Sequence, residues 1–130
     1  MRLIPLVSLC VALAAPAMAK PHLSEVKEID DRLMQIAIAD ELRKTCDDID
    51  ARMIRGLGQL NELRSQAKSM GYSNDEIEDY VTSKSEKKRM RQRAEAWLSG
   101  QGVNSKNNDS FCAFGRQQIS KGTYIGSLLR

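Results

Sequence analysis

Two cysteines, Cys46 and Cys112, constrain this chain more than any other feature of its sequence. A third, Cys10, lies in an amino-terminal stretch that has the three parts of a secretory signal: Arg2 first, then an apolar run, then small residues up to Ala19. Cleavage after Ala19 would leave an even pair of cysteines in an oxidising compartment, where a disulfide is the expected state. We therefore expect one bridge between Cys46 and Cys112.

The same stretch predicts where the protein works. Its apolar run, residues 3–15, is shorter than the roughly 20 residues that a membrane-spanning helix needs, and no other long apolar segment follows. A lipid anchor on Cys10 is disfavoured because Leu9 stands where a lipoprotein signal has a small residue. We predict a cleaved signal peptide over residues 1–19, a single helical domain over residues 20–130 without a transmembrane segment, and a periplasmic or secreted location.

The two remaining cysteines have other uses to weigh. Two separately buried thiols are the alternative to a bridge. A metal site is disfavoured because His22 is the only histidine, and neither Cys46 nor Cys112 has a second cysteine within a chelating turn. We expect no metal ligands and no cofactor.

Apolar residues recur every three or four positions through most of residues 24–121, which is the spacing of amphipathic helices. Ser73 and Glu76 form a capping box, in which each side chain satisfies a backbone N–H of the other residue. The apolar phase slips soon after that box, so we expect a break near Thr82 to Ser85. The expected helices cover residues 24–45, 49–70, 74–82, about 84–99, and 111–121.

The carboxy-terminal tail is too apolar to be a free end, since it holds Tyr124, Ile125, Leu128 and Leu129. Burying such side chains stabilises a fold by roughly 1.5–3 kcal/mol each. We therefore predict an all-α protein, a small bundle of four to five helices with one disulfide and a docked carboxy-terminal tail.

Two glycines, Gly56 and Gly58, stand in the middle of the second expected helix. Each destabilises a helix interior by about 1 kcal/mol relative to alanine. They are either tolerated defects or a place where another backbone comes close.

Four cations form a stripe at positions i, i+3, i+4 and i+7: Lys84, Lys87, Lys88 and Arg91. One interpretation is contact with an anionic partner in the cell envelope, such as lipid head groups, polysaccharide or an acidic protein face. The more ordinary interpretation is a solvated helix face. Nucleic acid is not an expected partner, because the formal net charge of the whole chain is only +3.

No catalytic set stands out. His22 lies just after the expected cleavage site, and the chain has no Gly-x-Ser-x-Gly, phosphate-binding loop or haem-attachment motif. The acids from Asp47 to Asp50 suggest calcium, but the sixth position of such a loop needs a glycine and holds another residue. We expect a protein that is not an enzyme.

A set of residues spread over nearly the whole chain after residue 19 resembles an uncharacterised family of small exported alphaproteobacterial proteins, a domain of unknown function. The family has no assigned activity, so the resemblance implies only a bacterial, periplasmic setting and a tail with a structural or recognition role. The residues that carry it are Cys46, Ala51, Arg52, Met53, Gly71, Tyr72, Arg93, Trp97, Leu98, Phe111, Cys112, Gly115, Arg116, Ile119, Gly122, Ile125, Gly126, Leu128, Leu129 and Arg130.

The leading functional hypothesis is a non-enzymatic periplasmic protein that acts by contact with an unknown protein partner in the cell envelope, as an accessory subunit or adaptor. The surfaces expected to make that contact are the four-cation stripe and a recognition surface of Arg116, Ile125, Leu128 and Leu129. The alternative is a periplasmic stress or acid chaperone that binds unfolded clients. The 17 acidic residues make loosening at low pH plausible for such a protein.

Overall fold

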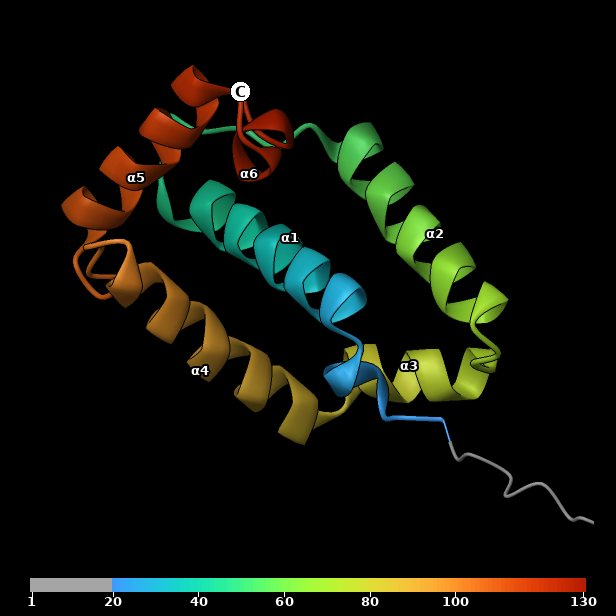
Figure 1. The fold of residues 1–130 in the computed structure, drawn as a ribbon. Helices are drawn as coiled ribbons and strands as arrows, with labels where there is room; N and C mark the ends of the chain where they lie inside the picture. The colour runs from blue at the N-terminus through green and yellow to red at the C-terminus, as the bar shows by residue number, and fades with distance from the viewer. Residues whose placement is uncertain (1–19) are drawn as a thin grey trace, which may run out of the picture.

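The computed structural model describes residues 20–130, so the predicted signal peptide over residues 1–19, with Cys10, lies outside the described residues. Residues 20–130 form one 3₁₀ turn and six α-helices without a β-strand (Figure 1). This confirms the predicted all-α class. The elements are η1 Leu23–Glu25, α1 Lys27–Thr45, α2 Met53–Ser69, α3 Asn74–Thr82, α4 Lys84–Gly100, α5 Asn108–Lys121 and α6 Tyr124–Ser127.

Helix α1 is the central element of the bundle. It contacts η1, α2, α4, α5 and α6, and Figure 1 shows α2 and α4 on its two sides with α5 and α6 near its carboxy-terminal end. Met34, Ile38 and Leu42, at helical spacing along α1, are all buried. The rest of the fold is therefore arranged around one helix that has little solvent-facing surface.

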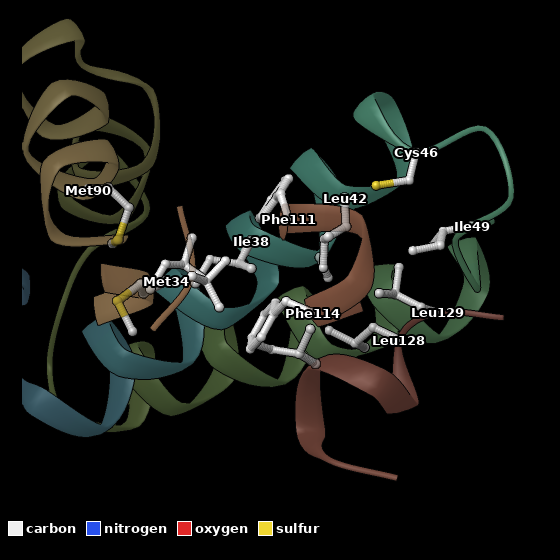
Figure 2. Close-up of a cluster of buried hydrophobic side chains, with 14 residues drawn as sticks. Met34, Ile38, Leu42, Cys46, Ile49, Met90, Phe111, Phe114, Leu128 and Leu129 are labelled. Atoms are coloured by element: carbon white, nitrogen blue, oxygen red, sulfur yellow. The ribbon is translucent and has the colours of Figure 1, made fainter. Parts of the chain in front are cut away.

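The buried side chains form two clusters. The larger joins α1 to α4, α5 and the tail, and Figure 2 shows its side chains meeting beside α1. The smaller joins the start of α1 to the end of α2 and to α3. The larger cluster includes Met34, Ile38, Leu42, Ile49, Met90, Leu98, Phe111, Phe114, Ile125, Leu128 and Leu129, and the smaller includes Leu23, Ile29, Ala67, Tyr72, Ile77 and Tyr80.

The predicted disulfide is present. Cys46 ends α1 and is bonded to Cys112 of α5, with a Cα–Cα distance of 5.7 Å and a sequence separation of 66. The alternative of two separately buried thiols is therefore wrong. The bridge therefore fastens the carboxy-terminal end of α1 to α5, at one end of the larger cluster.

The tail docks as predicted, and it also delays the start of α2. Asp50 and Arg130 exchange two backbone hydrogen bonds, at 2.8 and 2.9 Å, and the Arg52 N–H donates to the Leu128 carbonyl at 2.8 Å. Backbone groups that pair with the tail cannot also begin a helix. The second helix therefore starts at Met53, later than the predicted residue 49.

Local caps explain the other helix ends. The Ser73–Glu76 capping box starts α3 as predicted, and Ser83 ends α3 and begins α4, which confirms the expected break. The first helix, however, begins at Lys27 and not at residue 24, because Val26 is extended and separates η1 from α1. Helix α5, the last one predicted, begins at residue 108, three residues early, because the Asn107 side chain accepts the Ser110 N–H at 3.0 Å.

Of the two interpretations of the α2 glycines, the structure supports tolerated defects, and the close backbone approach lies elsewhere. An added Cβ at Gly56 or Gly58 would meet no atom within 4 Å, so the close-approach interpretation is wrong there. At Gly126 of α6 an added Cβ would lie 1.9 Å from the backbone oxygen of Gln118 in α5. The glycine that permits tight packing is therefore in the docked tail.

Candidate functional site

Helix α2 turns a row of large apolar side chains toward solvent. Ile54 is 89% exposed and Leu57 is 57% exposed, and Met53 and Leu60 are exposed as well. Ala67 is the only residue of α2 that is buried. Monomeric soluble proteins rarely leave a large contiguous apolar patch uncovered unless it binds something. This face of α2 is the first candidate for a contact surface.

Two adjoining hollows follow this face along the seam between α1 and α2. One, of about 290 Å³, reaches the docked tail, and the other, of about 230 Å³, reaches α3. Leu33, Leu57 and Leu60 line both, so the two hollows adjoin at these side chains. We call the pair the α1–α2 groove, and its apolar walls include Leu33, Ile36, Met53, Leu57, Leu60 and Leu129.

The groove exists because the apolar arc of α2 is wider than the face that α1 covers. At 100° per residue, Leu57 lies about 120° around α2 from Leu63, which is half-buried. Gly56 lines the groove without a side chain to fill it, and its added Cβ would meet nothing within 4 Å. The sequence of α2 therefore leaves both a hollow and an apolar rim beside it.

The rim of the groove is basic. Arg43 and Lys44 both bind the single carboxylate of Asp40, at 2.8 and 2.9 Å. Burial would raise the pKa of Asp40, but hydrogen bonds from Lys44 and Arg43 outweigh it and hold that pKa below its ordinary value. Arg52 donates to the Leu129 carbonyl at 3.1 Å and takes part in none of the ion pairs within residues 20–130. The lining at the tail end of the groove therefore holds two cations, Arg43 and Arg52, and one anion, Asp40.

A second constellation is buried on another side of α1. The Asp30 carboxylate is 3% exposed and accepts hydrogen bonds from Arg89 at 2.6 Å, from Arg93 at 2.7 Å and from the Tyr80 hydroxyl. We call these four residues the Asp30 cluster. Since Tyr80 belongs to α3 and both arginines belong to α4, the cluster ties three helices together around one charge.

Electrostatics in the Asp30 cluster favour the ionised carboxylate. Burial would raise the pKa of Asp30, but the hydrogen bonds from Arg89 and Tyr80 and the charges of Arg89 and Arg93 outweigh it, so the pKa lies below its ordinary value. Burial and the hydrogen bond to Asp30 raise the pKa of Tyr80 far above its ordinary value, so its hydroxyl stays a donor. Both carboxylate oxygens of Asp30 accept hydrogen bonds, and no buried side-chain nitrogen or oxygen within residues 20–130 lacks a partner, which is typical of a structural network.

Comparison with known protein families matches residues 21–130 to a family of unknown function, DUF5333. The chain belongs to DUF5333. The match agrees with the resemblance drawn from individual residues insofar as both point to a domain of unknown function. No curated protein and no solved structure matches the chain.

The predicted cation stripe lies on the solvent side of α4 in this DUF5333 protein. Lys84, Lys87, Lys88 and Arg91 are exposed, and none of them takes part in an ion pair within residues 20–130. The interleaved Arg89 points the other way, into the Asp30 cluster. Helix α4 therefore uses its inward arginines for structure and leaves four outward cations free of carboxylates in the described chain.

The four residues of the predicted recognition surface do not lie on one surface. Arg116 is exposed and its guanidinium lies 3.2 Å from an Asp48 carboxylate oxygen. Ile125, Leu128 and Leu129 are buried and pack in the core, because the tail that carries them docks. Only Leu128 and Leu129 reach a hollow, where they line the tail end of the α1–α2 groove.

The sole histidine has a local partner set. His22 Nδ1 lies 2.7 Å from Ser24 Oγ, and Nε2 lies 3.9 Å from a Glu86 carboxylate oxygen, an order of groups also found in hydrolases. However, Nδ1 also accepts the Ser24 backbone N–H at 3.2 Å, which caps η1. A catalytic base needs a lone pair that is free for its nucleophile. We therefore assign His22 to capping.

Residues 20–130 contain no group of three or more histidine, cysteine, aspartate or glutamate side chains placed to hold a metal ion. Across the same residues, none of the helices combines the length and the apolar character needed to cross a bilayer.

Sequence reasoning missed the groove and the Asp30 cluster. The signal for the groove is present in α2, where Met53, Ile54, Leu57 and Leu60 span more of the helix circumference than one neighbour can cover. Asp30 shows no such local signal, because its arginine partners lie 59 and 63 residues away in the chain.

Proposed function

We propose that this DUF5333 protein is exported to the periplasm and acts there, without catalysis, by binding a protein partner in the cell envelope. The α1–α2 groove is the contact surface in this proposal. The observation that carries it is the exposed apolar face of α2 beside two adjoining, mainly apolar hollows. Export is supported by the secretory features of residues 1–19 and by a disulfide, which persists in an oxidising compartment.

The energetics favour a protein-sized partner for this surface. Removing a large apolar side chain from water contributes roughly 1.5–3 kcal/mol, and Met53, Ile54 and Leu57 are all more than half exposed. A few well-packed apolar side chains in a hollow carry most of the energy of a typical interface. The rim cations Arg43 and Arg52 add polar contacts at the edge, where they contribute more to specificity than to affinity.

The test is the change Leu57→Asp, which places a charge in the wall shared by both hollows. The matched control is Met70→Asp, because Met70 is also an exposed apolar residue at α2 but does not line either hollow. Each variant is produced in the source bacterium and cross-linked in the periplasm. The proteins it captures are then compared with those captured by the unmodified protein. We expect Leu57→Asp to lose the main cross-linked partner and Met70→Asp to keep it.

A partner set that is the same for both variants and for the unmodified protein would remove the groove from consideration. Thermal unfolding of the purified variants checks that both are folded and similarly stable, so that a lost partner does not reflect a lost fold. Both substitutions add one carboxylate to an exposed position, where effects on stability are usually within about 0.5 kcal/mol.

The cation stripe is a second contact surface in this proposal, and its partner carries negative charge. Its support is that Lys84, Lys87, Lys88 and Arg91 are exposed and take part in no ion pair in the described chain. Reversing all four charges and repeating the periplasmic cross-linking tests it. We expect loss of a partner that Leu57→Asp retains, and an unchanged partner set would dismiss the stripe.

The acid-chaperone alternative is supported by the Asp30 cluster. Protonation of Asp30 at low pH would leave Arg89 and Arg93 facing a neutral group, which weakens the tie between α1 and α4. The protein would then expose more of its core to unfolding clients. The test measures aggregation of a model client at pH 2 to 3 with and without the protein, and failure to suppress aggregation ends this alternative.

A further inference from the structure

Most of the wall of the α1–α2 groove is helical, and this restricts what can occupy it; at the tail end the wall is formed by Ala51 and Leu129, which pair as an antiparallel β-bridge. Inside α1 and α2 the backbone N–H and C=O groups already bond within each helix, and at the tail end Asp50 and Arg52 already pair with the backbone of Arg130 and Leu128. The helical walls therefore offer no free edge for an extended strand. An extended peptide would bury its own polar backbone against Leu33 and Leu57 without partners. A helix satisfies its backbone internally and presents only side chains, so it suits such a groove.

The groove has the length of a helix of several turns. Helix α2 has 17 residues, which correspond to about 25 Å, and the two hollows follow it from Met53 to Ala67. A helix lying along that line would place apolar residues at positions i, i+3 or i+4, i+7 and i+11 against the walls. The opposite face of such a helix would stay in solvent.

The charge of the rim selects among helices. Arg43 and Arg52 line the tail end of the groove beside one carboxylate, that of Asp40, and Arg52 takes part in no ion pair within residues 20–130. Arg64, which lines the α3 end of the groove, has an exposed partner, Glu78, at 3.3 Å. A helix with acidic residues beside its apolar stripe would complete this rim, whereas a basic helix would meet like charge.

The same charges disfavour a second copy of this protein as the occupant. The exposed face of α2 would have to enter the groove of another copy, and α2 itself carries Arg55, Arg64 and Lys68 against one acid, Glu62. Two copies would therefore bring a basic helix to a basic rim. Like charges placed face to face across an interface are unfavourable.

We infer that the occupant of the α1–α2 groove is an amphipathic helix of a partner protein, with acidic residues flanking its apolar stripe. The inference rests on the proposed function and names the class of partner at the same site. The partner helix lies as a third helix against α1 and α2, with its apolar side chains on Leu33, Leu57 and Leu60 and its carboxylates toward Arg43 and Arg52.

The test uses designed peptides with the exported protein. The first peptide has 17 residues to match α2, leucines at i, i+3, i+7, i+10 and i+14, and glutamates beside them. Its counterparts carry lysines in place of the glutamates, the same composition in scrambled order, or a central proline that prevents a continuous helix. Fluorescence anisotropy measures binding, circular dichroism measures the gain of helix, and a long-chain fatty acid is tested as a competitor.

We expect the glutamate peptide to bind more than about tenfold tighter than the lysine, scrambled and proline peptides, with a gain of helix on binding. Binding should weaken with salt, as for exposed charges. Leu57→Asp should abolish binding and Met70→Asp should not. Arg52→Glu should weaken it by about fivefold or more, the scale of a rim ion pair, whereas the matched charge reversal Lys121→Glu, at an exposed position at the end of α5, should leave it unchanged.

Equal affinity for the glutamate and lysine peptides, or binding of the proline peptide without helix, would overturn the inference. The inference would also be overturned if the fatty acid bound the groove more tightly than the glutamate peptide and displaced that peptide. If those results appear while Leu57→Asp still loses its periplasmic partner, the contact function stands and the class of occupant is wrong. If Leu57→Asp also keeps its partner, the proposed function itself fails.

Discussion

Replacing Asp30 with asparagine tests how much of the fold depends on one buried charge. The substitution keeps the size of the side chain and removes the negative charge that Arg89 and Arg93 share. Removing one partner of a buried ion pair destabilises proteins by about 3–5 kcal/mol. The Arg89 and Arg93 side chains are each 33% exposed, and each keeps a second carboxylate, that of Glu86 or Asp31. We therefore expect the lower end of that range, about 3 kcal/mol.

That loss of stability should be easy to measure. An unfolding entropy of about 2.1 cal/mol/K per residue over about 110 residues converts 3 kcal/mol into a fall in Tm of roughly 13 °C. Urea unfolding followed by circular dichroism at neutral pH should show the same loss as a lower midpoint with an unchanged slope.

The effect has a defined pH dependence. The pKa of Asp30 is lower in the folded state, so its charge stabilises the fold fully above the unfolded pKa of about 3.9, and this stabilisation is lost as the pH falls through the folded value. The difference between Asp30→Asn and the unmodified protein should therefore shrink below about pH 4.

The matched control is Asp40→Asn on the same helix. Asp40 is also held by two cations, Arg43 and Lys44, but its side chain is 43% exposed, so the expected loss is less than about 1 kcal/mol. Equal losses for the two variants would refute the reasoning that burial makes the Asp30 charge important. So would a difference between Asp30→Asn and the unmodified protein that stays constant from pH 7 to pH 2.5.

Three further substitutions test the architecture. Replacing Cys46 and Cys112 together by alanine removes a cross-link that closes 66 residues, which the chain-entropy model values at about 4 kcal/mol, and urea unfolding with and without reductant measures it. Gly126→Ala should destabilise by about 3 kcal/mol or more, because the new Cβ meets the backbone oxygen of Gln118 and no side-chain rotation relieves it; thermal unfolding shows the loss. Gly58→Ala should stabilise α2 by about 0.5–1 kcal/mol, because the new methyl group meets no atom within 4 Å, and an unchanged or lower Tm contradicts that.

The parts of the fold that were predictable depend on chemistry close in the sequence. The Ser73–Glu76 box and the break at Ser83 are local features, and both appear where expected. The bridge between Cys46 and Cys112 followed from counting cysteines, which left only one pairing after residue 19. The fold class was predictable because apolar residues at helical spacing need a shared core. The docked tail was predictable because its apolar residues need burial.

The parts that were missed depend on partners far apart in the chain. The start of α2 is set by backbone bonds between Asp50 and Arg130, which helical periodicity cannot reveal. Helical periodicity also places Leu57 on the apolar face of α2, but it does not show whether α1 covers that face. Asp30 resembles an ordinary solvent-facing acid until α4 brings its two arginines to it.

The central position of α1 has a consequence for how the chain is made. Synthesis runs from the amino terminus, so α1 emerges before every other long helix in residues 20–130, yet much of its cover comes from α5 and α6 at the other end. Met34, Ile38 and Leu42 must therefore remain unshielded until the last residues have appeared. The nascent chain can aggregate throughout that interval, and a chaperone that binds α1 would protect it until α5 and α6 have been synthesised.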